Sequence, residues 1–131
     1  MKKSIFREYD IRGVVDRDLT PEVVQDIGQA VGSLAAERGE TGVAVGRDGR
    51  LSSPALCDAL KAGIRAAGLN VIDLGAVSTP LLYYATHTLD ATRAGVMVTG
   101  SHNPPQYNGL KIVIDRIALH GEVIRNLRCR I

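Results

Sequence analysis

Short apolar runs alternate with longer amphipathic segments along most of the chain, and this alternation is the strongest limit on its fold. Residues 43–45, 70–74 and 94–98 read as buried strands. Longer stretches with apolar residues at helical spacing lie before and between these runs. A strand, helix, strand order requires crossover connections, so the pattern predicts βαβ units. We therefore expect an α/β fold of three layers, with a mixed, mainly parallel sheet and helices on both faces.

The starts of three predicted helices are marked by a hydroxyl residue followed by proline. The hydroxyl oxygen accepts a hydrogen bond from the first turn, and proline fits the first helical position. We expect the first helix to end near Gly39 and the second near Gly68, because glycine favours helix ends. An apolar segment at 121–131 is expected to form a further helix at the boundary to a second domain. The three start signals are Thr20-Pro21, Ser53-Pro54 and Thr79-Pro80.

The composition limits the setting and the partners of the protein. The chain has 131 residues, enough for one domain with a hydrophobic core, and its net charge is only +2. We therefore expect no nucleic-acid partner. The two cysteines, Cys57 and Cys129, have no metal-binding or redox spacing. There is no signal-peptide pattern and no apolar run of membrane-spanning length, so we expect a cytoplasmic location and no membrane partner.

The stretch at 99–111 holds most of the reactive side chains. It is rich in Gly, Asn and Pro, and it brings a hydroxyl, an imidazole, a phenol and an amine together between two apolar runs. The glycines that a hydrolase nucleophile elbow requires on either side of Ser101 are absent, and so is a P-loop. A serine that carries a phosphoryl group fits this stretch, with His102 and Lys111 as partners. A plain connecting loop is the open alternative.

A charged loop is expected to lie beside this stretch. In a parallel sheet, the loops at the carboxyl ends of the strands share one edge. Arg47, Asp48 and Arg50 follow the strand at 43–45, so we expect them near Ser101. A solvated polar turn followed by a helix cap remains open for these three residues.

The amino-terminal segment, residues 5–15, is expected to be extended, because aromatic and β-branched residues favour strands. Tyr9 and Arg12 are its residues of interest. Taken alone, the segment also fits a strand with a core tyrosine and a solvated arginine.

Three motifs give the chain a resemblance to a known family. In chain order they are Phe6-Arg7-Glu8-Tyr9-Asp10-Ile11-Arg12-Gly13, then Gly46-Arg47-Asp48-Gly49-Arg50 with Ser52-Ser53, then Thr99-Gly100-Ser101-His102-Asn103-Pro104-Pro105 with Tyr107-Asn108-Gly109-Leu110-Lys111. They resemble signatures of the α-D-phosphohexomutases, the phosphomannomutase/phosphoglucomutase family. Gly100 and the Phe-Arg-Glu-Tyr opening look more like the bacterial mannose/glucose branch than the glucosamine branch. The resemblance implies that residues 1–131 form a single domain, domain I, with domains II–IV absent from this chain.

The resemblance implies an enzyme, an intramolecular phosphotransferase of the isomerase class. Such an enzyme interconverts hexose 1-phosphate and hexose 6-phosphate through a phosphoserine and a hexose 1,6-bisphosphate. It also implies a Mg²⁺ cofactor, which Ser101 would reach through its phosphate. The other ligands are expected from an Asp-Gly-Asp-Gly-Asp run in a second domain, and no such run occurs here. The implied partners are hexose phosphates and the remaining domains of a longer parent chain.

The family's roles carry over to matching positions of this sequence. Ser101 would carry the phosphate, Lys111 would offset its negative charge, and His102 would manage a proton or steady the phosphate. The residues implied in substrate or phosphate binding are Tyr9, Arg12, Asn103, Arg47 and Arg50. A different class also stays open, a non-catalytic sugar-phosphate-binding module with a degenerate mutase fold.

Expressed alone, the 131-residue chain is expected to fold but to show almost no mutase turnover, because the implied metal and sugar contacts lie in other domains. The measurement is a coupled assay of glucose 1-phosphate conversion. Near-normal rates from this chain alone would contradict the expectation.

Overall fold

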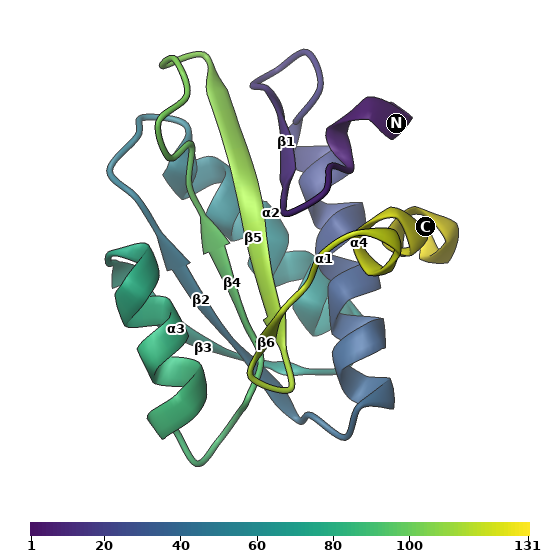
Figure 1. Cartoon of the computed structure of the whole chain (residues 1–131), viewed down its shortest axis with the longest axis vertical. Helices are drawn as coiled ribbons and strands as arrows, with labels where there is room; N and C mark the ends of the chain where they lie inside the picture. The colour runs from purple at the N-terminus through teal and green to yellow at the C-terminus, as the bar shows by residue number, and fades with distance from the viewer.

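A sheet of six strands forms the middle of the molecule in the computed structural model, which describes all residues, 1–131. The strand order is β1-β5-β4-β2-β3, with β6 paired to β5 (Figure 1). The strands are β1 (Ile11–Val14), β2 (Gly42–Arg47), β3 (Asn70–Ala76), β4 (Gly95–Val98), β5 (Tyr107–Ile114) and β6 (Ile117–Ala118). The helices are α1 (Pro21–Glu37), α2 (Ser53–Ala66), α3 (Thr79–Thr88) and α4 (Glu122–Leu127), with short 3-10 turns at Lys3–Ile5 and Arg128–Arg130.

The strand directions confirm the predicted mixed, mainly parallel α/β sheet. β2 pairs in parallel with both β3 and β4. β5 runs antiparallel to β4 on one side and to β1 on the other, so β1 points the same way as β4. The carboxyl ends of β1, β2, β3 and β4 therefore lie at one edge of the sheet, where β5 begins.

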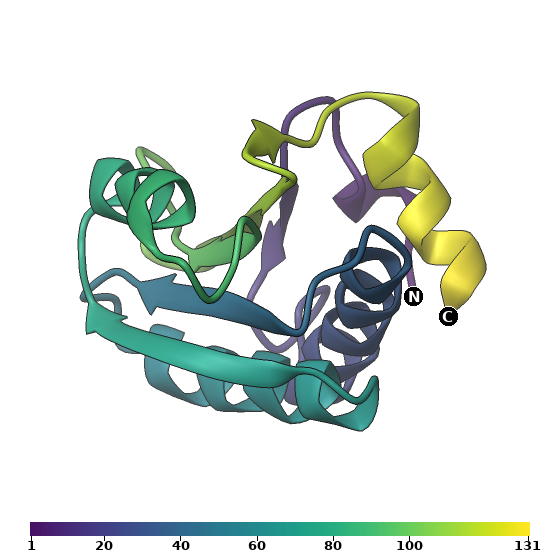
Figure 2. The ribbon, with the colours of Figure 1, turned by 90° about the horizontal axis from the view of Figure 1, so that it is seen from below.

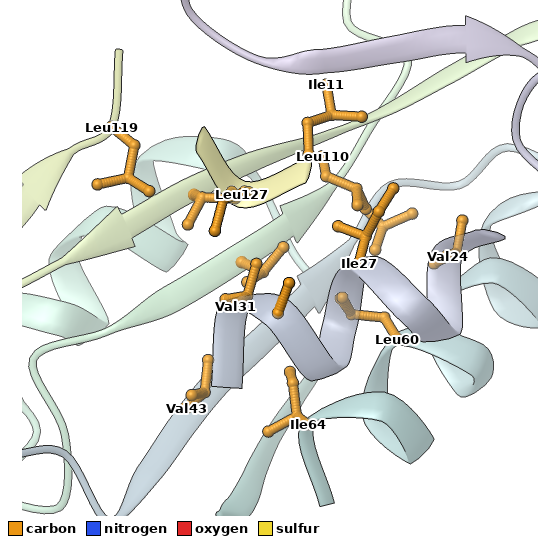
Figure 3. Close-up of a cluster of buried hydrophobic side chains, with 14 of the residues drawn as sticks. Ile11, Val24, Ile27, Val31, Val43, Leu60, Ile64, Leu110, Leu119 and Leu127 are labelled. Atoms are coloured by element: carbon orange, nitrogen blue, oxygen red, sulfur yellow. The ribbon is translucent and has the colours of Figure 1, made fainter. Parts of the chain in front are cut away.

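The two faces of the sheet are covered by different helices. α1 and α2 lie on one face and α3 lies on the other (Figure 2). Because side chains alternate along a strand, each strand contributes to both cores. Val45 and Val98 belong to the larger core under α1 and α2, whereas Ala44 and Met97 pack with Leu82 of α3. In the larger core, side chains of α1, α2, β5 and α4 lie against one another (Figure 3).

The caps of α1 and α3 show how accurately the hydroxyl-proline signal predicts the first residue of a helix. Thr20 caps α1 as predicted, since its hydroxyl oxygen accepts a hydrogen bond of 3.2 Å from the backbone nitrogen of Val23. The prediction that Thr79 caps α3 is wrong: the cap is Ser78, which accepts from Leu81 at 3.3 Å. Proline is accepted at either the first or the second helical position, so the signal leaves the cap uncertain by one residue.

The start of α2 differs in the same way. Ser52 is the cap residue by position, but no side chain caps this helix. Ser53 is the first helical residue and is fully buried, and its hydroxyl donates to Asp48 in the preceding loop. The first residue of α2 therefore uses its hydroxyl to bind the preceding loop and does not cap the helix.

The two ends of the chain are less regular than expected. The prediction of one extended segment over residues 5–15 is wrong, because bends separate a 3-10 turn from β1, which holds only Ile11–Val14. At the other end α4 forms, but Val123 and Ile131 are 39% and 49% exposed, so the single apolar face predicted for 121–131 is narrower. Ile124 and Leu127 alone enter the core from that helix. No helix has both the length and the apolar character that crossing a membrane requires.

α1 and α2 approach each other closely at two glycines. A Cβ atom on Gly63 would overlap the carbonyl oxygen of Gln25, and one on Gly28 would lie 2.5 Å from the carbonyl oxygen of Leu60. Both obstacles are backbone atoms, which cannot move aside as a flexible side chain does. The distance between the two helices therefore requires glycine at both positions.

Replacing Gly63 by Ala is expected to lower the free energy of unfolding by about 1 to 3 kcal/mol, because the added methyl forces the helices apart. Urea unfolding measures the change. Gly49→Ala is the matched control, since nothing lies within 4 Å of a Cβ at that position. An equal loss in both variants would contradict this reading of the helix crossing.

Candidate functional site

Three loops meet at the edge where the parallel strands end. They are residues 15–19 after β1, residues 48–52 after β2, and residues 99–106 after β4, which we call the serine loop (Figure 1). The backbone nitrogen of Asp48 donates to the carbonyl oxygen of Val98, and that of Val15 donates to Gln106. The charged loop, predicted at 46–50 and found at 48–52 after β2, thus meets the serine loop as the strand order predicted.

Ser101 is exposed and its hydroxyl has no hydrogen-bond partner within the chain. Its backbone is left-handed, with φ of 52°, an uncommon state for a residue other than glycine. This conformation is held partly by the side chain of Thr99, whose hydroxyl oxygen accepts a 3.0 Å hydrogen bond from the Ser101 nitrogen. His102 follows, also exposed and without a side-chain partner. The backbone of Ser101 is therefore held by its neighbours, while its hydroxyl makes no hydrogen bond within the chain.

Asp48 binds both loops through its two carboxylate oxygens. Oδ2 accepts from the Thr99 hydroxyl and from the Gly100 nitrogen, each at 2.9 Å. Oδ1 accepts from the Arg50 nitrogen at 3.1 Å and from the Ser53 hydroxyl. Burial is the largest single influence on this group and raises the pKa of Asp48, but these four donors together outweigh it, so the pKa lies below its ordinary value.

Arg50 is directed at the backbone of the serine loop. Nη1 donates to the carbonyl oxygens of Pro104 at 2.7 Å and Tyr107 at 3.1 Å. Nη2 donates to those of Ser101 at 3.1 Å and Asn103 at 2.6 Å. The geometry favours a structural contact for Arg50, where the sequence suggested a phosphate contact.

Arg12 and Lys111 share the face of the sheet that α3 partly covers. Ile11 and Leu110 lie opposite each other and both enter the larger core, so Arg12 and Lys111, next along their strands, project from the other face. Arg12 pairs with Gly109, which makes Lys111 its diagonal neighbour at a backbone distance of about 7 to 8 Å. Lys111 has no ion-pair partner, so it remains free to meet an anion.

Arg12 is oriented by two contacts. Its Nη2 and Nε donate to Oδ2 of the buried Asp10 at 2.9 and 3.2 Å. Its Nη1 donates to the side-chain oxygen of Asn103 at 3.3 Å, which ties the serine loop to the Arg12 and Lys111 face. The structure thus brings together Ser101, Asn103, Arg12 and the Lys111 face.

Two predicted residues lie apart from this group. Arg47 pairs with Val98 and lies on the same side of β2 as the core residue Val45, the face opposite Lys111. Its Nη1 donates only to the Asp48 carbonyl oxygen, at 3.3 Å. Tyr9 is 76% exposed, so the alternative of a core tyrosine is wrong, and it contacts the serine loop through no hydrogen bond.

Sequence reasoning missed Asn108, which is fully buried at the start of β5. Its amide donates to the hydroxyls of Ser52 at 2.9 Å and Ser53 at 3.0 Å, so it fixes the first turn of α2 to β5. The sequence did contain a signal, the Ser52-Ser53 pair after the charged loop. A buried amide requires polar partners, and these two hydroxyls supply them.

No group of three or more His, Cys, Asp or Glu residues is arranged to hold a metal ion. Two carboxylates near the serine loop are already occupied, Asp48 by the two loops and Asp10 by Arg12, and Asp16, exposed at the hollow beside the loop, stands without a second carboxylate. These residues do not by themselves fit a Mg²⁺ site. Mg²⁺ binding through a phosphate on Ser101 stays a prediction.

The largest hollow lies beside this group of residues. Its volume is about 610 Å³, and residues 15–16, 50–52 and 103–106 contribute to its walls, with Leu51 fully exposed at the rim. Ser101, Arg12 and Lys111 do not line it. The predicted phosphate-binding residues Arg12 and Lys111 therefore lie outside this hollow, on the face of the sheet that α3 partly covers.

Replacing Asp48 by Asn is expected to lower the free energy of unfolding at pH 7 by about 1 to 3 kcal/mol, since donors facing Asp48 lose their acceptor. The wild-type advantage is full above about pH 5, where the carboxylate is ionised in the folded and unfolded chains. Below about pH 4 the unfolded chain binds the proton first, so the advantage declines as the pH falls toward the lower folded pKa. Urea unfolding of both proteins at pH 7 and pH 3 measures the difference, and an equal gap at both would contradict this assignment.

Comparison with known proteins shows which family the chain resembles. A family model described as phosphoglucomutase/phosphomannomutase, alpha/beta/alpha domain I, matches residues 3–127. The phosphomannomutase/phosphoglucomutase of Pseudomonas aeruginosa is 56% identical over 128 residues, which make up 98% of this chain and 27% of the relative. The phosphoglucomutase of Neisseria meningitidis serogroup B is 47% identical over 125 residues, 95% of this chain and 27% of the relative.

The fold agrees with solved structures as well. The crystal structure of a phosphoglucomutase/phosphomannomutase family protein from Burkholderia thailandensis matches with a TM-score of 0.94 and 44% identity, over 99% of this chain and 30% of that one. The chain thus spans only 27% of the length of the curated relatives cited above. Since the family match extends over nearly all of its residues and the fold agrees this closely, the chain belongs to the phosphoglucomutase/phosphomannomutase family, of which it spans domain I.

Proposed function

We propose that this chain is the phosphate-carrying domain of a hexose-phosphate mutase, with Ser101 Oγ as the carrier. The observation that supports this most is the Ser101 hydroxyl itself, exposed and unpartnered on a loop whose backbone is held by its neighbours. Arg12 and Lys111, on the adjacent face, supply positive charge where a phosphoserine would add about −1.5 to −2.

In the proposed step, phosphoserine gives its phosphoryl group to a free hydroxyl of a hexose monophosphate. The bond from phosphorus to Ser101 Oγ breaks, a bond to the sugar oxygen forms, and the hydroxyl proton is lost while Oγ gains one. The product is a hexose bisphosphate, which returns its other phosphate to Ser101 by the reverse chemistry. Such transfers depend on positioning and on charge stabilisation, which Arg12 and Lys111 would provide, with His102 as the group that handles the proton.

The substrates proposed are the 1- and 6-phosphates of mannose and glucose. The names of the relatives support this, since they include phosphomannomutase/phosphoglucomutase and phosphoglucomutase. The remainder of the site is proposed to come from further domains, because the relatives are much longer than this chain. Mg²⁺ is proposed only for that complete site.

Replacing Ser101 by Ala in the full-length protein is expected to abolish turnover, a loss on the order of 10⁴-fold or more, because no other group would carry the phosphate. The measurements are the coupled mutase assay and the mass of one phosphate on the intact protein. Ser4→Ala is the control, since Ser4 is exposed and has no side-chain partner.

Two outcomes decide between the open classes. A Ser101→Ala protein that still turns over would contradict the phosphoserine mechanism. A wild-type protein that binds hexose phosphate but never turns over would instead support a non-catalytic binding module.

A further inference from the structure

The terminal nitrogens of the Arg50 guanidinium are fully used on the backbone of the serine loop. A guanidinium has five N–H groups. Nη1 and Nη2 use theirs on four carbonyl oxygens of Ser101, Asn103, Pro104 and Tyr107. The fifth donor, on Nε, faces Oδ2 of Asp48 at 3.5 Å. A substrate phosphate would therefore find the four Nη donors of Arg50 occupied unless Arg50 released the loop.

The four carbonyls explain why a cation is needed at this point. Each carbonyl oxygen carries partial negative charge, and four that converge on one point repel one another. A planar guanidinium satisfies them together, which an ammonium with three donors cannot do.

Asp48 completes the arrangement and anchors it to the core. The carboxylate accepts from Thr99 and Gly100 at the start of the serine loop and pairs with the guanidinium. It also accepts from Ser53, a fully buried residue in α2. Arg50 lies so close to Gly100 that a Cβ there would overlap its guanidinium carbon. The whole loop from 99 to 107 is therefore held from one side.

We propose that Asp48 and Arg50 form a clamp that positions Ser101 for phosphoryl transfer, and that Arg50 does not itself contact substrate. This inference rests on the proposed function of Ser101. The clamp keeps the left-handed backbone of Ser101, because it holds the carbonyl on one side of that residue through Arg50 and the loop start through Asp48. Asp48 and Arg50 are thus positioning residues that act through the serine loop.

The test compares Arg50→Lys and Asp48→Asn with wild type in the full-length protein. Lysine keeps the charge but cannot bind four carbonyls, so kcat is expected to fall on the order of 100-fold, the scale of a misplacement of about 1 Å. KM for glucose 1-phosphate is expected to stay within about threefold, because no substrate contact is lost. Amide hydrogen exchange is expected to become faster in residues 101–107 and to stay unchanged in α1 and α2.

Arg93→Lys is the matched control. Arg93 also makes a forked contact, to Glu40 at 3.1 Å and to Asp115 at 3.3 Å, but at the opposite edge of the sheet. This variant is expected to lose some stability while keeping wild-type kcat and wild-type exchange in residues 101–107.

Several outcomes would overturn the clamp. A raised KM with unchanged kcat in Arg50→Lys would mean that Arg50 binds the substrate phosphate. Wild-type kcat with wild-type loop exchange in a folded variant would show that the contacts do not position Ser101. Should Arg50→Lys fail to fold, Asp48→Asn gives the same readouts. Turnover retained in Ser101→Ala would refute the proposed function and with it the role of the clamp in phosphoryl transfer, whereas faster exchange in residues 101–107 of Arg50→Lys would still show that Arg50 holds the loop.

Discussion

The Asp48 carboxylate is the junction on which the functional edge of this sheet depends. It follows β2 directly, and it reaches the start of the serine loop, the guanidinium of Arg50 and the first turn of α2. Burial makes such a charge costly unless its oxygens are satisfied, and here each oxygen has two hydrogen-bond donors. A single carboxylate thus joins two neighbouring loops and the first turn of α2.

The positive charges at this edge have different surroundings and therefore different uses. Arg50 donates its hydrogen bonds to backbone oxygens, and Arg12 donates to the side chains of Asp10 and Asn103. Lys111 has no carboxylate partner and stands on the same face of the sheet as Arg12, whereas Arg47, also without a carboxylate partner, lies on the opposite face. A phosphate arriving near Ser101 would meet one mobile ammonium and one oriented guanidinium, rather than a general excess of positive charge. This agrees with a net charge of only +2 for the whole chain.

Sequence reasoning reached the architecture because periodicity reports burial. The runs at 43–45 and 94–98 alternate between two cores, and the apolar spacing of α1 and α2 follows the face that they bury. The same reasoning placed Ser101 and the charged loop at 46–50 at one edge, whereas Arg12 was expected there only from the family resemblance. It could not assign the partners of Arg50 or the burial of Asn108, because these depend on which way a side chain turns after the chain has closed into a sheet. The caps at Ser78 and Ser52 lie one residue before the predicted positions for a similar reason. Two adjacent hydroxyl residues can each serve as the cap, and the sequence does not show which one precedes the first helical residue.

The left-handed backbone of Ser101 also restricts the choice of hydroxyl at this position. Threonine and serine both accept a phosphoryl group, but a β-branched side chain is a rare outlier at positive φ, where its second γ atom crowds the backbone. With φ of 52°, this turn accommodates serine and disfavours threonine on steric grounds, before any question of reactivity arises. The shape of the turn therefore selects the amino acid that presents the hydroxyl.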